Sequence, residues 1–189
     1  MEKIIVNHKR TKVVYDIDKK TYIKYFYPNF YKKLKYFFRF RRYPGENYKY
    51  ISEILEKNGI RIANVLFYSK YNITTKEVNG KNLFEELKKA NKEEGEELLK
   101  KYIEIVSKII NIGIYFGDFN FGNFIVSNKE LYAIDLEDYR KDFFSSYRKK
   151  SLIKRLKRQL MERTEVVGKM CEYYNGQDIF DKIINKLKI

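Results

Sequence analysis

The segment GDFNFGNFIVSNKELYAIDLE, residues 117–137, constrains the fold more than any other part of the chain. A polar loop leads into two short runs, NFIVS and LYAIDL, which are rich in β-branched and aromatic residues and are separated by the turn signal NKE. This pattern predicts a β-hairpin. The hairpin would carry Asp118 and Asn123 before its first strand and Asp135 at the end of its second strand.

The first third of the chain alternates between apolar and polar positions in the manner of β-strands. The runs KIIV, TKVVYDI and TYIKYFY are separated by polar turns, which predicts an antiparallel meander. A single helix over GENYKYISEILEKNG follows and stops at Gly59. After it, RIANVLFYSK and ITTKEV predict two more strands.

From NLFEELKK onward the apolar spacing becomes helical. The run EELLKKYIEIVSKIINIG carries a broad apolar stripe and stops at Gly113, which predicts a buried core helix, and helix is expected again from residue 143 to the end. This order predicts one α+β domain with two lobes. The small β-rich N-terminal lobe is expected over about residues 1–78 and the helical C-terminal lobe over about residues 79–189, meeting near KEVNGKN, residues 76–82.

Composition bounds the partners and the compartment. A formal net charge of +15 over 189 residues indicates a polyanionic partner, which leaves nucleic acid, an anionic membrane surface and a phosphorylated substrate open. No apolar run approaches the roughly 18 residues of a membrane span, and the N-terminus lacks the apolar core of a signal peptide. The single Cys171 forms no internal disulfide. We therefore expect a cytoplasmic protein.

The residues around the predicted hairpin point to phosphoryl transfer. Asp118 and Asn123 have the D-x-x-x-x-N spacing of kinases, in which the aspartate accepts the proton of the acceptor hydroxyl. Asn123 and Asp135 supply hard oxygen ligands that would hold Mg²⁺ on the phosphates of ATP. We expect these residues to converge with Lys24 in a cleft between the two lobes.

Kinases of this plan also need a phosphate-binding lysine on the third strand and a helix glutamate that orients it. Lys24 in TYIKYF and Glu46 in PGENYKYISEIL stand at those positions, although Glu53, two turns further along the helix, is an alternative to Glu46. We also predict that Glu77 and Asn79, in KEVNGKN, help to bind the nucleotide.

Several segments resemble the lipopolysaccharide core heptose kinases of the WaaY/RfaY type, which are protein-kinase-like sugar kinases. They are TKVVYDIDKKTYIKYFYP, GENYKYISEILEKNGI, KEVNGKNL and GDFNFGNFIVSNKELYAIDLEDYRK. The resemblance implies a bacterial cytoplasmic enzyme that transfers the γ-phosphate of ATP to a heptose of the lipopolysaccharide inner core. It also implies an ion pair between Lys24 and Glu46, Asp118 as the base, and Asn123 and Asp135 as metal ligands.

The sequence departs from the kinase pattern in four ways. No glycine precedes Lys24 in VNHKRTKVV, so the cover over the phosphates would be built from ordinary backbone with Lys9 or Arg10. Phe116 replaces the histidine that often precedes the catalytic loop, and DLE replaces D-F-G. An A-P-E segment is missing, which makes a regulated protein kinase a weaker interpretation.

Two basic clusters, KKLKYFFRFRR at residues 32–42 and YRKKSLIKRLKRQ at residues 147–159, mix cations with apolar side chains. Such surfaces suit an anionic membrane leaflet, so we expect peripheral binding at the inner face of the cytoplasmic membrane. They would equally suit RNA, and a basic nucleic-acid-binding module is one alternative. We expect no nucleic acid, because Asp118 and Asp135 would repel its phosphates unless a metal intervened. A minimal protein kinase or aminoglycoside kinase is the other alternative.

Overall fold

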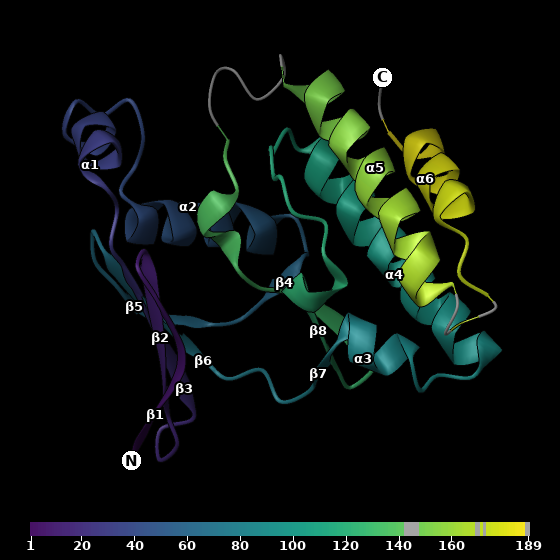
Figure 1. The fold of residues 1–189 in the computed structure, drawn as a ribbon, viewed down its shortest axis with the longest axis horizontal. Coiled ribbons are helices and arrows are strands. Elements are labelled where there is room, and N and C mark those ends of the chain that lie inside the picture. The colour runs from purple at the N-terminus through teal and green to yellow at the C-terminus, as the bar shows by residue number, and fades with distance from the viewer. Residues whose placement is uncertain (142–147, 169–170, 172, 188–189) are drawn as a thin grey trace. The chain divides into compact units, whose positions relative to one another are not determined.

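The computed structural model describes residues 1–141, 148–168, 171 and 173–187 (Figure 1). The chain divides into two compact units, Met1–Val78 and Asn79–Ile189, which are described separately below. Part of the helix predicted from residue 143, and the first residue of the second basic cluster, Tyr147, lie outside the described residues.

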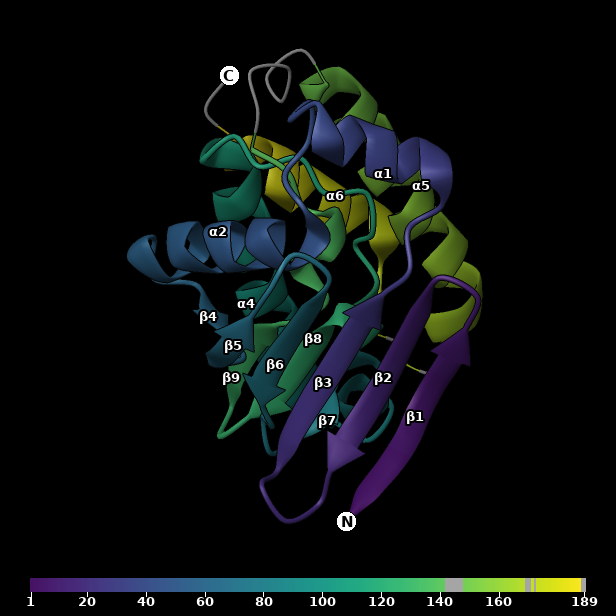
Figure 2. The ribbon, with the colours of Figure 1, turned by 90° about the vertical axis from the view of Figure 1, so that its left-hand side faces the viewer.

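The N-terminal unit is built on an antiparallel five-stranded sheet with the order β1-β2-β3-β6-β5 (Figure 2). Its strands are β1 (Glu2–His8), β2 (Thr11–Asp16), β3 (Thr21–Phe26), β5 (Val65–Tyr68) and β6 (Asn72–Lys76). The meander of the first three strands is therefore confirmed. The predicted strand RIANVLFYSK is divided in two, β4 (Arg61–Ile62) and β5, because residues 63 and 64 leave the extended ladder.

Two helices join β3 to β4: α1 (Phe30–Phe37) and α2 (Pro44–Lys57). Proline stands at the first position of α2, where its missing N–H costs no helical hydrogen bond, and the helix packs on β5 and β6. Gly45 lies so close to the carbonyl oxygen of Ser69 that any side chain there would collide with it. Ile51 and Leu55 are completely buried, so α2 forms the core of the unit.

The C-terminal unit combines a small hairpin with helices. Its elements are β7 (Lys81–Asn82), α3 (Leu83–Leu87), α4 (Lys92–Asn111), β8 (Phe124–Ser127), β9 (Glu130–Ala133), α5 (Lys149–Val167) and α6 (Gly176–Asn185), with short 3₁₀ turns at Phe121–Asn123 and Leu136–Asp138. The longest helix, α4, contacts β9 and α6, and α6 also packs on α5 (Figure 1). None of the described helices is long and apolar enough to cross a membrane.

The core of this unit gathers on α4. The helix begins with a reciprocal capping box between Asn91 and Glu94. Tyr102, which is fully buried, packs edge-on against Phe121 and Phe124 with ring centroids 4.8 and 5.2 Å away. The core helix thus carries the hairpin and the loop before it.

The predicted hairpin is present, but its second strand is shorter than expected. Asn128 and Lys129 both have positive φ, 51° and 62°, which is the conformation of a tight type I′ turn. The predicted strand LYAIDL was too long: β9 ends at Ala133, and Asp135 turns the chain into the left-handed region with φ 63° and ψ 44°. A residue in that conformation cannot continue a strand.

Candidate active site

The loop of residues 117–123 is shaped by two successive side chain-to-backbone turns. Oδ1 of Asp118 accepts a hydrogen bond from the N–H of Asn120 over 3.1 Å, and Oδ1 of Asn120 accepts one from the N–H of Gly122 over 3.0 Å. Short Asp and Asn side chains stabilise such turns by satisfying backbone donors locally. The Asp118 side chain remains exposed to solvent. The turns therefore fix the backbone while the carboxylate stays accessible.

The same loop is anchored through the backbone of Phe119. Its carbonyl oxygen accepts hydrogen bonds from the hydroxyl of Tyr102 (2.9 Å) and from Nη1 of Arg163 (2.7 Å), and its N–H donates to Oε1 of Gln159 (3.0 Å). The Phe119 ring is fully buried. Helices α4 and α5 thus both hold the residue next to Asp118, which limits how far its carboxylate can move.

Asn123 connects the loop to the region of Asp135. Its Nδ2 donates to the carbonyl oxygen of Asp118 over 3.4 Å, and its own carbonyl oxygen accepts from the N–H of Ile134 over 3.0 Å. When Nδ2 donates to a backbone carbonyl, Oδ1 is the end of the amide that can bind a cation. The structure thus brings the loop of Asp118, Asn123 and the residue preceding Asp135 together within one unit.

Asp135 is exposed and has the left-handed backbone conformation described above. This conformation costs a non-glycine residue about 1–2 kcal/mol, and aspartate is one of the few side chains that tolerate it. Buried Leu136 and Tyr139 follow, and the Tyr139 ring lies 4.7 Å from that of Phe116, so packing maintains the strained position. Observed strain of this kind is typical of functional sites.

The chain then returns to the start of the loop. The N–H of Tyr115 donates to the carbonyl of Arg140 over 2.8 Å, and the N–H of Arg140 donates to the carbonyl of Tyr115 over 2.7 Å. This pair of backbone bonds joins the segment before Asp118 to the segment after Asp135.

The remaining predicted residues, apart from Asn79, belong to the N-terminal unit. Lys24 lies on the central strand β3, opposite residues of both neighbouring strands, and its Nζ is 5.9 Å from the centroid of the Phe26 ring. Glu46 lies half-buried in the first turn of α2. The ion pair between Lys24 and Glu46 stays a prediction. So does the convergence of Lys24 with the residues of the C-terminal unit.

The alternative glutamate and the two predicted residues of KEVNGKN have other surroundings. Glu53 is exposed and lies 3.4 Å from Nζ of Lys49, one turn away on the same helix. Oε2 of Glu77 accepts a hydrogen bond from the hydroxyl of Tyr15 over 3.0 Å. Asn79 is exposed and lines a cavity of about 510 Å³ beside the hairpin turn, and none of the other predicted site residues lines this cavity.

Known proteins resemble this chain in structure but not in sequence. No protein-family model and no curated protein matches the sequence. The solved streptomycin–ATP–APH(2″)-IIa ternary complex matches with a TM-score of 0.60 at 11% identity, over 98% of this chain and 78% of that chain. The Rio2 kinase–ADP/Mg²⁺–phosphoaspartate complex from Chaetomium thermophilum matches with a TM-score of 0.58 at 13% identity, over 97% of this chain and 64% of that chain. This chain therefore spans less than two thirds of that kinase. The chain has a protein-kinase-like fold.

A kinase-like fold needs few protein ligands for its metal. Within residues 1–141, 148–168, 171 and 173–187, no group of three or more His, Cys, Asp or Glu side chains is placed to hold a metal ion by itself. Mg²⁺ in phosphoryl transfer is usually held by one or two side chains, because substrate phosphates and water complete its shell. Asn123 and Asp135 carry oxygen atoms of the kind that Mg²⁺ binds, and their role as its ligands stays a prediction.

Helix α5 adds cations to the kinase-like loop. A Cβ at Gly117 would lie 2.9 Å from Nη1 of Arg155, so this guanidinium packs directly against the residue before Asp118. The guanidinium of Arg148 lies 5.8 Å from the centroid of the Tyr115 ring. The backbone around the exposed carboxylate is therefore flanked by positive charge.

Sequence reasoning missed the residues that support this loop. Arg155, Gln159 and Arg163 repeat every four residues along α5 and so share one face of that helix. That spacing is visible in the sequence. A glutamine and an arginine beside the apolar positions of a helix indicate side chains that could bind a neighbouring polar group. The sequence does not show that Gln159 and Arg163 bind the backbone of Phe119.

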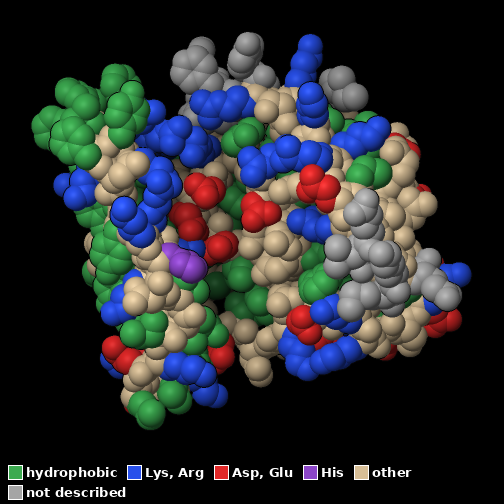
Figure 3. Space-filling model, in the orientation of Figure 1, with side chains coloured by type: hydrophobic (Ala, Val, Ile, Leu, Met, Phe, Trp, Pro, Cys, Tyr) green, Lys and Arg blue, Asp and Glu red, His purple; other side chains and the backbone are tan. Residues whose placement is uncertain are grey.

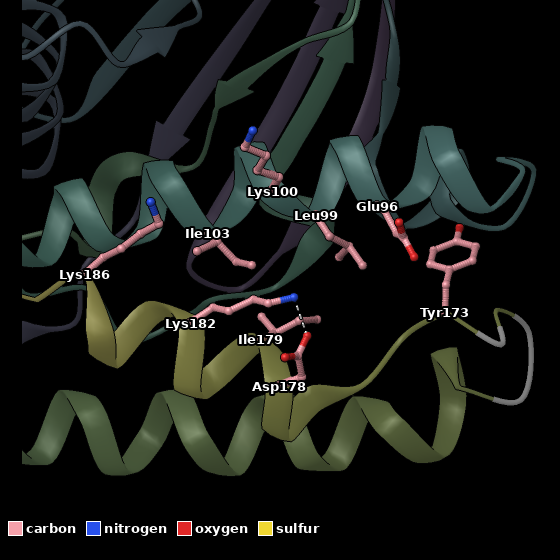
Figure 4. Close-up of a pocket in the computed structure, with 9 residues that line it drawn as sticks. All are labelled: Glu96, Leu99, Lys100, Ile103, Tyr173, Asp178, Ile179, Lys182 and Lys186. Carbon is pink, nitrogen blue, oxygen red and sulfur yellow. Dashed lines mark ion pairs between the residues drawn. The ribbon is translucent and has the colours of Figure 1, made fainter.

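A second cavity, of about 460 Å³, lies between α4 and α6 (Figure 4). Leu99, Ile103 and Ile179 line it, and at its edge Nζ of Lys182 lies 2.6 Å from Oδ2 of Asp178. None of the predicted site residues lines this cavity. It is therefore separate from the candidate active site of the kinase-like fold.

Proposed function

We propose that the chain is an ATP- and Mg²⁺-dependent phosphotransferase that acts on a sugar hydroxyl, namely that of a heptose in the lipopolysaccharide inner core. The observation that carries the proposal is the exposed Asp118 carboxylate on a loop whose backbone is held from both α4 and α5. General bases of kinases need both properties, because the carboxylate must reach the acceptor and must not drift from it.

In the proposed reaction the acceptor oxygen forms a bond to the γ-phosphorus while the bond from that phosphorus to the β,γ-bridging oxygen breaks and ADP leaves. Asp118 takes the proton of the hydroxyl. Oδ1 of Asn123 and the carboxylate of Asp135 would hold Mg²⁺, which would supply the neutralisation of charge on the phosphates. Lys24, from the N-terminal unit, contacts the nucleotide phosphates, and Glu46 orients it.

The charge beside Asp118 favours an anionic acceptor. Arg155 packs against Gly117, and Arg148 lies near Tyr115, so an acceptor that approaches Asp118 meets guanidinium groups. These groups bind phosphate or carboxylate well and repel cations. The likeness to APH(2″)-IIa with streptomycin supports an aminoglycoside kinase as a second candidate. Aminoglycosides are polycations at neutral pH, however, and such arginines disfavour them.

The test is an acceptor screen with purified protein, labelled ATP and Mg²⁺. Core saccharide bearing heptose should be labelled, streptomycin should not, and Asp118→Asn should depress the labelling about 10²- to 10⁴-fold. Arg155→Gln should raise the KM for core saccharide, whereas Arg158→Gln, at an exposed position on the same helix, should not. This difference should shrink as salt rises.

Transfer to an aminoglycoside or a protein alone would overturn the heptose assignment and keep the phosphotransferase. Tight, salt-dependent RNA binding that survives Asp118→Asn, without any ATP turnover, would overturn the phosphotransferase and favour the nucleic-acid-binding alternative.

A further inference from the structure

The region of α1 exposes an unusual number of large apolar side chains. Within residues 30–40, the exposed fractions are 78% for Phe30, 70% for Tyr31, 43% for Leu34, 74% for Phe37, 58% for Phe38 and 79% for Phe40. Figure 3 shows hydrophobic side chains gathered at the upper left, over α1. A contiguous exposed patch of this kind marks an interaction site. We call these six residues, five aromatic ones and Leu34, the aromatic patch.

The aromatic patch stands on a firm base. Tyr36 is the one residue of α1 that is buried, and its ring lies 5.5 Å from that of Tyr43, which in turn lies 5.4 Å from that of Tyr71. This stack fixes α1 to the N-terminal unit. The rings of the patch contact one another instead, with Phe37 and Phe38 edge to face at 5.4 Å.

The segment that carries the patch has charges of one sign only. Residues 28–43 contain no acidic residue and carry the cations Lys32, Lys33, Lys35, Arg39, Arg41 and Arg42. The helix lacks the acidic first turn that would complement its dipole, although it does have an Asn29 cap. Lys33 and Arg39 are exposed. A segment that combines exposed apolar side chains with cations and no acidic residue is complementary to a surface that is apolar inside and anionic outside.

The second basic cluster shows that this combination is specific to α1. In α5 the apolar residues Leu152, Leu156 and Leu160 are 2%, 0% and 0% exposed, because they pack into the core of the C-terminal unit. Among the described residues of that cluster, Ile153 is half-buried and every exposed side chain is polar or charged. Large exposed apolar side chains therefore occur in the first of the two clusters and not in the described part of the second.

We propose that residues 30–42 dock the protein on an anionic lipid bilayer, with the aromatic patch in the headgroup region and the surrounding cations on lipid phosphates. The amount of exposed apolar surface, 43% of Leu34 and 58–79% of the five rings, favours a bilayer, because its interface buries such side chains beside cations. RNA binding through the same rings is an outcome of the test below. The proposal does not depend on the phosphotransferase activity, because it concerns only binding.

The test is sedimentation of the whole chain with vesicles of phosphatidylcholine alone or mixed with phosphatidylglycerol. Binding to the anionic vesicles should be at least about tenfold tighter and should weaken with salt. The double variant Phe37→Ser/Phe40→Ser should weaken it at least about tenfold, as loss of two buried rings predicts. Phe67→Ser, which removes a 56% exposed ring on β5, is the matched control and should bind like the parent.

The variant Lys33→Gln/Arg39→Gln should bind more weakly and show a shallower salt dependence. Equal binding to both vesicle types, or binding unaffected by the aromatic changes, would overturn the proposal. The proposal would also be overturned if the protein did not bind vesicles and instead bound RNA, or associated with itself, through Phe37 and Phe40. Circular dichroism of each variant checks that the fold is intact. All the substituted side chains are exposed, so the fold should not change.

Discussion

Nδ2 of Asn123 donates a hydrogen bond to the carbonyl oxygen of Asp118 over 3.4 Å. Through its own carbonyl, the same asparagine holds the N–H of Ile134, the residue before Asp135. One side chain and one backbone group therefore connect the proposed base to the proposed metal ligand. The two aspartates nevertheless have different proposed tasks, and their substitutions should differ.

Asp118→Asn should leave Mg-ATP binding within about threefold of the parent and lower kcat about 10²- to 10⁴-fold, because the base acts on the acceptor. Asp135→Asn should instead abolish the magnesium dependence of nucleotide binding. Asparagine also tolerates the left-handed backbone at position 135, so the fold should remain. Titration calorimetry with ATP, with and without Mg²⁺, separates the two. Identical behaviour of both variants contradicts the roles.

Glu46 and Glu53 can be distinguished by matched substitutions. Glu46 is half-buried in the first turn of α2, whereas Glu53 is exposed and lies near Lys49. If Glu46 orients Lys24, Glu46→Gln should lower kcat/KM for ATP at least about tenfold, and Glu53→Gln should change it less than about twofold. Steady-state kinetics with varied ATP gives both values. The opposite order would assign the role to Glu53.

Arg163→Met removes the hydrogen bond from the guanidinium to the carbonyl of Phe119 while keeping an aliphatic side chain. A hydrogen bond from a charged donor contributes about 1.5–3 kcal/mol, so the free energy of unfolding should fall by about that amount and kcat should fall with it. Arg158→Met, which loses only an exposed pair with Glu162, should change stability by less than about 0.5 kcal/mol. Urea unfolding measures both. Equal losses would show that the loop does not depend on Arg163.

Burial raises the pKa of Tyr174 from 10.0 to about 12, while its hydroxyl donates to the carbonyl of Leu160. The folded protein therefore holds this proton more tightly than the unfolded chain does. Its contribution to stability is complete below pH 10 and is lost as pH rises through about 12. In that window one such group gives a slope of up to about 1.4 kcal/mol per pH unit. Tyr174→Phe should flatten the measured decline, and an unchanged slope would assign it to other groups.

Sequence patterns predict the elements better than they predict the contacts between them. The meander and the hairpin can be predicted because alternation and the turn signal NKE are local patterns. Asp118 and Asn123 can be proposed as a pair because their spacing in the sequence is short. The end of β9 cannot be predicted, since nothing in LYAIDL specifies the left-handed φ of Asp135. The support of Phe119 by Gln159 is also hidden, because 40 residues separate the two partners. Likewise, composition gives both basic clusters the same character, and only packing shows which one keeps its apolar side chains exposed.

The paired backbone hydrogen bonds between Tyr115 and Arg140 make a closed ring of the chain that contains both aspartates. Opening that ring frees the two loops at once, so they belong to one cooperative unit of local unfolding. Amide hydrogens at positions 115 and 140 should then give the same free energy of opening once each exchange rate is divided by its intrinsic rate. A ligand that binds to either aspartate would slow hydrogen exchange at both amides. These two amides would therefore report whether the site is occupied.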